Sequence, residues 1–255
     1  MKLSSRHQEI VNLVQQHGYV STEDLVEQFK VSPQTIRRDL NELADENKIR
    51  RHHGGATIPL SSVNTEYTAR KSMQLNEKDR IAEALAKHIP DGATLFIDIG
   101  TTPESVAKAL VKNHKDLRVV TNNINVAVIL MAKPDFKVIL TGGEVRNRDG
   151  GIVGEATLDF IRQFRLDFGI LGISGIDYDG SLLDFDYHEV RVKKVIIENS
   201  RSVYVAVDST KFGRNAMVNL GNISELQMLI TDQTPPPEIV TILQENEIPF
   251  EVLDQ

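Results

Sequence analysis

The stretch YVSTEDLVEQFKVSPQTIRRDLNELADENKIRRHHGGA, residues 19–56, predicts two short helices followed by a β-hairpin. The first helix begins after Ser21, which forms a capping signal with the acid three residues later. The second begins after Ser32, and Pro33 occupies its first position, where the missing N–H has no helical partner to lose. The Gly-Gly pair near the end of the stretch predicts a turn between two short strands within residues 49–58.

Residues 5–16, just before this stretch, repeat their apolar side chains at helical spacing and predict a further helix. Three short helices followed by a basic hairpin are typical of a winged helix-turn-helix. We therefore predict a small domain of this kind over residues 1–58.

The composition limits the class of protein. The 255 residues are 40% hydrophobic and 25% charged, as in a soluble globular protein with one small domain and one larger core. There is no cysteine, which excludes disulfides and suits the cytoplasm. The polar N-terminus lacks a signal-peptide core, and the longest apolar run, 126–132, is too short to span a bilayer. We expect a cytoplasmic protein with no membrane contact, no metal site and no cofactor.

Residues 59–75 show no clear period and are predicted to be a linker. A capping signal at Asn76 and Asp79 then predicts a helix, and strands and helices alternate from there to residue 255. This alternation predicts a mostly parallel α/β domain over residues 76–255 that binds an effector and forms oligomers. The expected strands are 94–99, 117–121, 136–142, 166–173, 202–208, 226–231 and 250–254.

The net charge of −7 argues against a uniformly basic nucleic-acid-binding protein. Basic and acidic residues balance in the first sixty residues, so the acidic excess lies in the larger domain. Any contact with DNA must therefore come from a local basic cluster in the small domain.

The helix after Ser32 carries such a cluster. At 100° per residue, Ile36, Leu40 and Leu43 share its apolar face. The opposite face and its flanks carry side chains that can read base edges in a major groove. The predicted DNA-binding residues of this helix and its cap are Ser32, Gln34, Thr35, Arg37, Arg38 and Asn41, and those of the hairpin are Arg50, Arg51 and His52.

A single amphipathic helix with one Arg-Arg pair is more often an ordinary solvated helix. The spacing of the three helices, the capped start and the basic hairpin together favour DNA binding instead. Because acidic residues gather at the far end of the helix, its first turns are expected to enter the groove of a double-stranded operator.

Candidate phosphate-binding turns follow the predicted strands. Asp98, Gly100, Thr101 and Thr102 lie between a strand and a helix that is predicted to start at Pro103, and N–H groups and hydroxyls at a helix start suit a phosphate. An ordinary strand-to-helix turn explains the same residues equally well. Further effector-binding candidates after strands are Thr121, Asn122, Asp208 and Lys211, and a weaker one is the turn with Arg146 and Arg148.

Acidic residues gather between residues 177 and 189. Asp177 and Glu189 are effector-binding candidates, because carboxylates can hold the hydroxyls of a polyol or act as general bases. Ordinary loop acids would give the same pattern. Gly169, Gly172 and Gly175 are explained adequately by close backbone packing.

The stretch 19–56 resembles the signature of DeoR-type bacterial transcription regulators, and the resemblance extends over essentially the whole chain. Within the family, RHHGGA, LFIDIGTTPE, GGIVGEATLDF, RLDFGILGISGID, DFDYHEVR and KFGRNAMV resemble a branch that answers to glycerol 3-phosphate. The resemblance implies a cytoplasmic repressor, a homo-oligomer (dimer or tetramer), an operator with two-fold symmetry, and glycerol 3-phosphate as inducer.

The effector domain of this family resembles the fold of ribose-5-phosphate isomerase. The resemblance implies that the turn 98–102, Asp208 and Lys211 line the ligand pocket, with Glu189 near the position of a catalytic acid. Three alternatives stay open: a family member with another sugar-phosphate inducer, an isomerase-like enzyme with an appended DNA-binding module, and a scaffold protein. Because glycerol 3-phosphate has no carbonyl to isomerise, we expect a regulator and not an enzyme.

Overall fold

The computed structural model describes residues 5–17, 19–46, 48–52, 54–57 and 67–253. The chain separates into two compact units, Met1–Val63 and Asn64–Gln255, and each is described by itself. None of the helices within the described ranges is long and apolar enough to cross a membrane.

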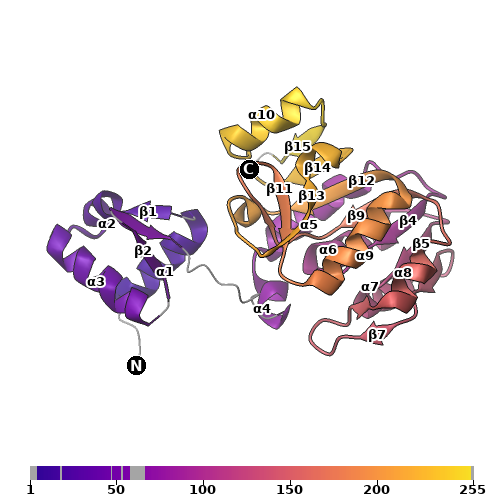
Figure 1. Cartoon of the computed structure of the whole chain (residues 1–255), viewed down its shortest axis with the longest axis horizontal. Coiled ribbons are helices and arrows are strands. Elements are labelled where there is room, and N and C mark those ends of the chain that lie inside the picture. The colour runs from indigo at the N-terminus through magenta and orange to yellow at the C-terminus, as the bar shows by residue number, and fades with distance from the viewer. Residues whose placement is uncertain (1–4, 18, 47, 53, 58–66, 254–255) are drawn as a thin grey trace. The chain divides into compact units, whose positions relative to one another are not determined.

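The N-terminal unit contains helices packed with a small antiparallel sheet (Figure 1). The strand order is β1-β3-β2. The predicted helices and hairpin are confirmed, while the first strand was not expected. The element bounds are α1 Ser5–His17, β1 Tyr19–Ser21, α2 Thr22–Phe29, α3 Pro33–Asp45, β2 Arg50–His52 and β3 Gly55–Thr57.

Both predicted helix starts of this unit are confirmed by their caps. The Ser21 hydroxyl accepts a hydrogen bond from the Asp24 amide at 3.0 Å, and the Asp24 carboxylate accepts one from the Ser21 amide at 3.3 Å. The Ser32 hydroxyl accepts from the Thr35 amide at 3.2 Å. These bonds satisfy N–H groups that the first turn of a helix leaves without backbone partners.

A buried ion pair ties α1 to α3. Asp39 lies on the inner side of α3, where Arg6 Nε donates to it at 2.6 Å and His7 Nε2 lies 3.2 Å away. Burial by itself would raise the pKa of Asp39, but the hydrogen bonds from Arg6 and His7 outweigh it and lower the pKa below its ordinary value. The contact links the start of α1 to the inner side of α3.

The C-terminal unit is built on a parallel sheet, seven-stranded in the described part of the chain, with the order β15-β14-β12-β9-β4-β5-β6 (Figure 1). All its neighbours pair in parallel, and every strand falls within a segment where the sequence predicts one or overlaps it. The bounds are β4 Thr94–Ile97, β5 Arg118–Thr121, β6 Lys137–Leu140, β9 Leu166–Leu171, β12 Ser200–Val207, β14 Met228–Thr231 and β15 Phe250–Val252.

Helices cover both faces of this sheet and create two apolar cores. One core joins the sheet to α8, α9 and α10, and the other joins it to α5, α6 and α7. The helix bounds are α4 Tyr67–Ser72, α5 Leu75–Ala86, α6 Thr101–Asn113, α7 Ile124–Leu130, α8 Glu155–Ile161, α9 Tyr187–Glu198 and α10 Pro237–Glu245. Smaller pieces are β7 Glu144–Val145, β8 Ile152–Val153, β10 Gly175–Ile176, β11 Ser181–Asp184 and β13 Val218–Asn222.

Three local predictions are wrong. The linker predicted at 59–75 contains the helix α4, while residues 58–66 lie outside the described part of the chain. Helix α5 begins at Leu75, and its N-cap Gln74 makes no side-chain cap, so the signal at Asn76 is not used. Helix α6 begins at Thr101, before Pro103, because Gly100 at φ 146° makes the turn out of β4.

The strand order reverses beside β4, which pairs with β5 on one side and with β9 on the other. Loops leave these neighbouring strands in opposite directions, and the crevice between them is where open parallel sheets bind ligands. The loops approach closely here: a Cβ on Gly172 would lie 2.8 Å from the Ile99 carbonyl, and one on Gly175 would lie 1.9 Å from the Arg214 carbonyl. The close-packing interpretation of these glycines is confirmed.

Candidate functional site

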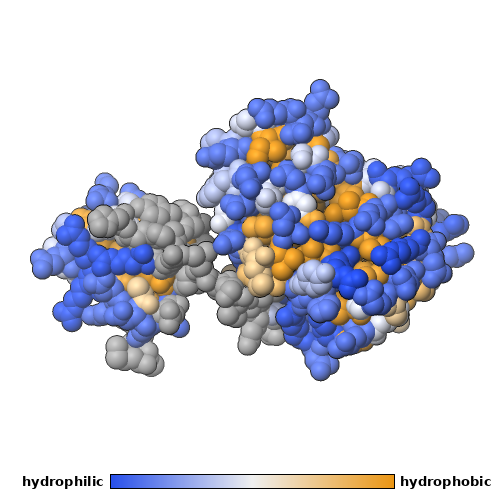
Figure 2. Space-filling view, viewed as in Figure 1, coloured by the Kyte–Doolittle hydropathy of each residue, from blue (hydrophilic) through white to orange (hydrophobic). Residues whose placement is uncertain are grey.

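The outer face of α3 is polar and exposed, as the sequence predicts. Ile36, Leu40 and Leu43 lie in the core of the N-terminal unit, each no more than 1% exposed. The described surface of this unit is mostly hydrophilic in Figure 2. The exposed side chains of α3 and its cap are Ser32, Gln34, Arg37, Arg38 and Asn41, and Thr35 is half-buried.

The β2–β3 hairpin contacts the same face. Arg51 is exposed and donates a hydrogen bond to the Asn41 side chain on α3. Arg50 and His52 lie on β2 beside it. The hairpin and α3 therefore form one continuous surface, and Arg38, paired with Glu42 at 2.9 Å, keeps its side chain 81% exposed on it.

A small pocket lies in the crevice beside β4 in the C-terminal unit. It is lined by the turn after β4, the turn after β9, and charged side chains from five further elements or loops. Gly100, Thr101 and Thr102 form one wall, and Gly172 packs beside them. The charged lining residues are Arg70, Asp149, Asp184, Glu189, Lys193 and Lys211.

One end of the pocket is cationic. Lys211 lies just after β12, and Arg70 reaches the pocket from α4. Burial lowers the pKa of Lys211 to about 8, against the attraction of Asp208, and the positive charges of Arg214, Arg70 and Lys78 lower it further. Arg70 Nε is buried and has no hydrogen-bond partner among the described residues. These cations repel one another, and the single charge of Asp208 does not balance theirs, so this end has an excess of positive charge.

The other end is a buried cluster of acids around one lysine. Lys193, on α9 and 2% exposed, donates to Asp184 and to the Gly172 carbonyl, the latter at 2.6 Å. Its Nζ lies 3.5 Å from Asp98 and 3.8 Å from Glu189. Burial alone would lower the pKa of Lys193, but the surrounding carboxylates raise it above its ordinary value.

Asp98 is the least satisfied member of this cluster. It is fully buried at the end of β4, and neither carboxylate oxygen has a hydrogen-bond partner within the described structure. Burial raises the pKa of Asp98 to about 6, although Lys193 opposes the rise. A buried carboxylate without hydrogen bonds is unfavourable, so a hydroxyl brought next to it would find a ready acceptor.

Two arginines from the loop before β8 form ion pairs with the acids at this end of the pocket. Arg146 is half-buried and contacts Asp149 at 2.7 Å, Asp186 at 3.1 Å and also Glu189. Arg148 contacts Asp186 at 2.7 Å. The loop acids near residues 184–189 are thus ion-paired structural groups, and Arg146 is not the exposed loop cation that its position in the sequence suggested.

Some sequence candidates do not line this pocket. The Thr121 hydroxyl donates to the Ile97 carbonyl at 2.6 Å and accepts from the Asn123 amide. Its hydrogen bonds are therefore made within the fold. Asn122 is fully buried and donates to the Ile152 carbonyl at 3.4 Å. Asp177 lies in the turn between β10 and β11, where its carboxylate accepts from the Tyr178 amide. Asp208 lies behind Lys211 and accepts from the Thr210 amide at 3.2 Å.

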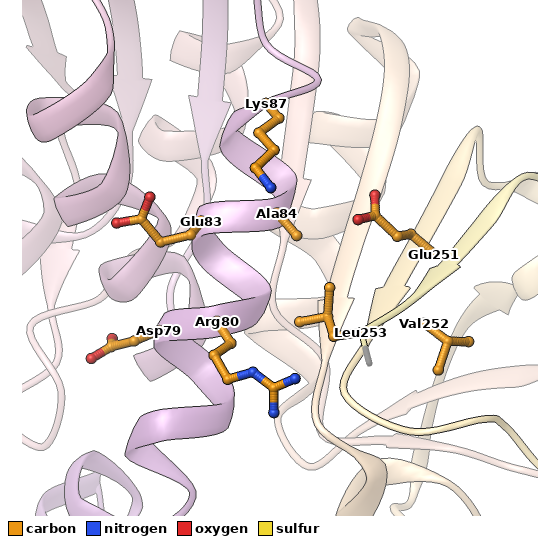
Figure 3. Close-up of a pocket in the computed structure, with 8 residues that line it drawn as sticks. All are labelled: Asp79, Arg80, Glu83, Ala84, Lys87, Glu251, Val252 and Leu253. Atoms are coloured by element: carbon orange, nitrogen blue, oxygen red, sulfur yellow. The ribbon is translucent and has the colours of Figure 1, made fainter. Parts of the chain in front are cut away.

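A larger depression, about 470 Å³, lies between α5 and the C-terminal segment (Figure 3). Its lining combines basic side chains with acids that would repel a phosphate: Asp79, Arg80, Glu83, Ala84, Lys87, Glu251, Val252 and Leu253. The charges are mixed, and its acids are exposed or half-buried, so it lacks the convergent buried groups of the crevice beside β4. Within the described ranges no cluster of His, Cys, Asp and Glu is arranged to hold a metal ion.

Arg70, Asp149 and Lys193 are charged pocket residues that the sequence did not lead us to expect. Lys193 falls on the apolar stripe of α9 between Val190 and Ile196, and a lysine in such a stripe is a signal of a buried charge. Arg70 carries no comparable signal, because α4 is short and follows a segment without periodicity.

Comparison with known proteins assigns the domain that carries α3 and the domain that holds the pocket to one family. Residues 6–62 match the DeoR-like helix-turn-helix domain, and residues 73–233 match the DeoR C terminal sensor domain. The chain is 65% identical over 252 residues to the glycerol-3-phosphate regulon repressor of Escherichia coli, covering 99% of this chain and 100% of that protein. The repressor of the same name from Haemophilus influenzae is 56% identical over 247 residues, covering 97% of this chain and 96% of that protein.

Solved structures share the fold at low sequence identity. The eIF2B beta subunit of Chaetomium thermophilum aligns with a TM-score of 0.54 at 13% identity, covering 94% of this chain and 82% of that chain, which shows a common fold alone. Ribose 5-phosphate isomerase A of Methanocaldococcus jannaschii aligns with a TM-score of 0.41 at 14% identity over 55% of each chain, a likeness too weak to support a function. From its two matched domains and its full-length relatives, the chain belongs to the DeoR family of helix-turn-helix transcriptional regulators.

Proposed function

We propose that this chain represses transcription by binding operator DNA through α3 and the β2–β3 hairpin. It leaves the operator when a phosphorylated metabolite, glycerol 3-phosphate, binds the pocket beside β4. The observation that carries the effector half of this proposal is the separation of charge in the pocket. The lining holds the cations Lys211 and Arg70 and the acids Asp184 and Glu189. Asp98, a buried acid without a hydrogen-bond partner in the described structure, lies outside the lining, 3.5 Å from the lining residue Lys193.

The cationic end suits the phosphate. A dianionic group between Lys211 and Arg70, at the start of α6, would relieve the repulsion that lowers the pKa of Lys211. The hydroxyls and amides of Thr101 and Thr102 lie on the same wall, where the positive end of the helix dipole adds to the attraction.

The acidic end suits hydroxyl groups. Asp184 and Glu189 line the pocket, and Asp98, which lacks hydrogen-bond donors within the described structure, lies 3.5 Å from the lining residue Lys193. A short polyol with a phosphate at one end matches this polarity, and the Escherichia coli and Haemophilus influenzae relatives are named for the glycerol-3-phosphate regulon. Because glycerol 3-phosphate has no carbonyl, we propose binding without turnover, in a cytoplasmic protein that needs no cofactor.

The direct test is fluorescence anisotropy with a labelled palindromic operator and the full-length protein. We expect glycerol 3-phosphate to release the DNA, and glucose 6-phosphate and fructose 6-phosphate to be much weaker. Release by a hexose phosphate alone would contradict the proposed effector but keep the family function. Robust conversion of any aldose or ketose phosphate would contradict binding without turnover.

Lys211→Met should remove the response to the effector while leaving operator binding intact. Loss of a charged hydrogen bond to phosphate should weaken effector binding roughly tenfold to a hundredfold. Since burial holds the pKa of Lys211 at about 8, wild-type affinity should also weaken as pH rises through that value and the lysine loses its proton. Calorimetric titration with glycerol 3-phosphate measures both effects.

Lys108→Met is the matched control, because Lys108 is exposed on α6 and does not line the pocket. It should leave both the affinity and its pH dependence unchanged. A Lys211→Met protein that keeps the wild-type pH dependence would show that another group binds the phosphate.

We further propose that the chain works as a homo-oligomer, so that paired α3 helices read an operator of two-fold symmetry. Several exposed apolar side chains gather on α7, β6 and β7, and β6 is the last strand of the sheet. A second copy of the chain on this face would cover Val128, Met131, Ile139, Leu140 and Val145.

Light scattering should give the mass of a dimer or tetramer. Met131→Glu should reduce this mass if the face is the interface. An unchanged mass would place the interface elsewhere.

A further inference from the structure

The pocket beside β4 is too small for the ligand that its charges suit. Its cavity is about 30 Å³, far below the roughly 300–1,000 Å³ of typical small-molecule pockets. Glycerol 3-phosphate has ten non-hydrogen atoms. At least one wall must therefore move before such a ligand can bind.

The walls from the sheet have little freedom to move. The turns after β4 and β9 pack against each other so closely that a Cβ on Gly172 would contact the Ile99 carbonyl and the Pro103 ring. Ile97, Ile170 and Leu171, which lead into these turns, are fully buried. Moving these turns would disrupt the central strands of the sheet.

The wall from α4 is attached differently. Arg70 is its contribution to the pocket, and α4 is a helix of 6 residues whose described side chains make polar contacts with the rest of the unit. Lys78 Nζ donates to the backbone carbonyls of Arg70 and Met73 at 2.6 and 2.5 Å. These contacts can be exchanged for others without opening an apolar core.

Tyr67 and Lys71 attach α4 to Glu104 on α6, and the shorter contact is that of Tyr67. Its hydroxyl donates to Glu104 at 2.5 Å and accepts from Asn125 at 2.9 Å. Glu104 is 3% exposed and lies in the first turn of α6, which also forms the wall of the pocket. Burial raises the pKa of the Tyr67 hydroxyl well above its ordinary value, so this hydroxyl stays a donor at all physiological pH values. A displacement of Arg70 would pull directly on this contact.

Helix α4 is also the first element of the C-terminal unit in chain order, and the segment that leads to the N-terminal unit enters it. Any change in the position of α4 therefore changes the point from which the DNA-binding unit is tethered.

We propose that α4 is a ligand-operated strap. The Tyr67–Glu104–Asn125 contact holds it in the position that supports operator binding, and a phosphorylated ligand displaces Arg70 and with it the whole helix. This inference rests on the proposed function for the identity of the ligand, but not for the role of the Tyr67 contact in DNA binding. Ligand and operator then select different positions of α4. Weakening the contact must therefore strengthen ligand binding and weaken operator binding.

Tyr67→Phe is the decisive change, because it removes the hydroxyl and keeps the ring. We expect operator affinity without ligand to fall roughly threefold to tenfold, and affinity for glycerol 3-phosphate without DNA to rise by a similar factor, as expected for the loss of one or two hydrogen bonds. Anisotropy measures the first quantity and calorimetry the second. Tyr187→Phe, at a 62% exposed position on α9, is the matched control and should change neither.

The sign of the ligand effect separates a strap from a merely structural tyrosine. If Tyr67 only stabilised the pocket, its loss would weaken ligand binding as well as DNA binding, and that result overturns the strap. Unchanged operator affinity overturns it too, whichever ligand is used. If the wild-type protein binds no glycerol 3-phosphate, the proposed effector fails, and the operator measurement still decides whether the Tyr67 contact supports DNA binding.

Discussion

Arg38→Ala should weaken operator binding roughly tenfold to a hundredfold, the effect expected when one arginine no longer reaches a groove. The side chain is 81% exposed on the outer face of α3, while Ile36 and Leu40 beside it in the sequence are buried. Its ion pair with Glu42, four residues later, is a surface pair that contributes little to stability. The variant should therefore fold normally and lose only its affinity for the operator, which anisotropy with the labelled operator measures.

The salt dependence shows which part of the DNA Arg38 contacts. If it contacts a phosphate, the variant should bind all sequences more weakly by the same factor, and the slope of log affinity against log salt should become shallower by about one. If it reads a base, the weakening should be confined to operators that carry that base.

Arg162→Ala is a close control for the change in charge. Arg162 follows α8 in the C-terminal unit, is 52% exposed, and is paired with Asp159 at 2.9 Å, much as Arg38 is paired with Glu42. It should leave operator affinity unchanged. Equal effects of the two substitutions would indicate a non-specific charge effect, and no effect of Arg38→Ala would favour a scaffold role for the helix-turn-helix domain.

The elements that the sequence predicts well are those in which local signals and packing agree. Helix α3 starts at Ser32 and Pro33 and buries Ile36 and Leu40, because the cap and the apolar period both specify the same helix. The strands of the parallel sheet are predicted because they are apolar runs covered on both faces. Strand β1 was missed because three residues carry no period, and only pairing with β3 makes them a strand.

The pocket is harder to predict, because its charges come from segments far apart in the chain. Thr101 and Thr121 both lie where a strand passes into a helix, yet the hydroxyl of Thr121 donates to the carbonyl of Ile97 on the neighbouring strand. Only the strand order decides which of the two turns faces the crevice. Arg70 joins the site through the docking of α4, which depends on tertiary contacts such as that of Tyr67 with Glu104.

Lys193→Met should destabilise the C-terminal unit by about 3–5 kcal/mol, the range measured when one partner of a buried ion pair is removed. Methionine matches the lysine stem in length, so the change removes charge more than volume. It leaves Asp98, Asp184 and Glu189 without the cation that they share, and Arg146 still contacts only the last of the three.

The pH dependence of this destabilisation identifies its cause. Burial already raises the pKa of Asp98 to about 6 in the presence of Lys193, and without the lysine the pKa of Asp98 should rise further. A carboxyl whose folded-state pKa is raised destabilises the fold when it ionises, so the penalty grows as pH rises and shrinks when the group is protonated. The variant should therefore be closer to wild type at about pH 5.5 than at about pH 8.

Urea unfolding at the two pH values, with hydrogen exchange of β4 and α9 to follow the C-terminal unit separately, measures this difference. Lys194→Met is the matched control, since Lys194 is the next residue of α9 but is exposed. It should change stability by less than about 0.5 kcal/mol at either pH. A Lys193→Met protein that is destabilised equally at both pH values would show that the ionisation of Asp98 is not the cause of the loss.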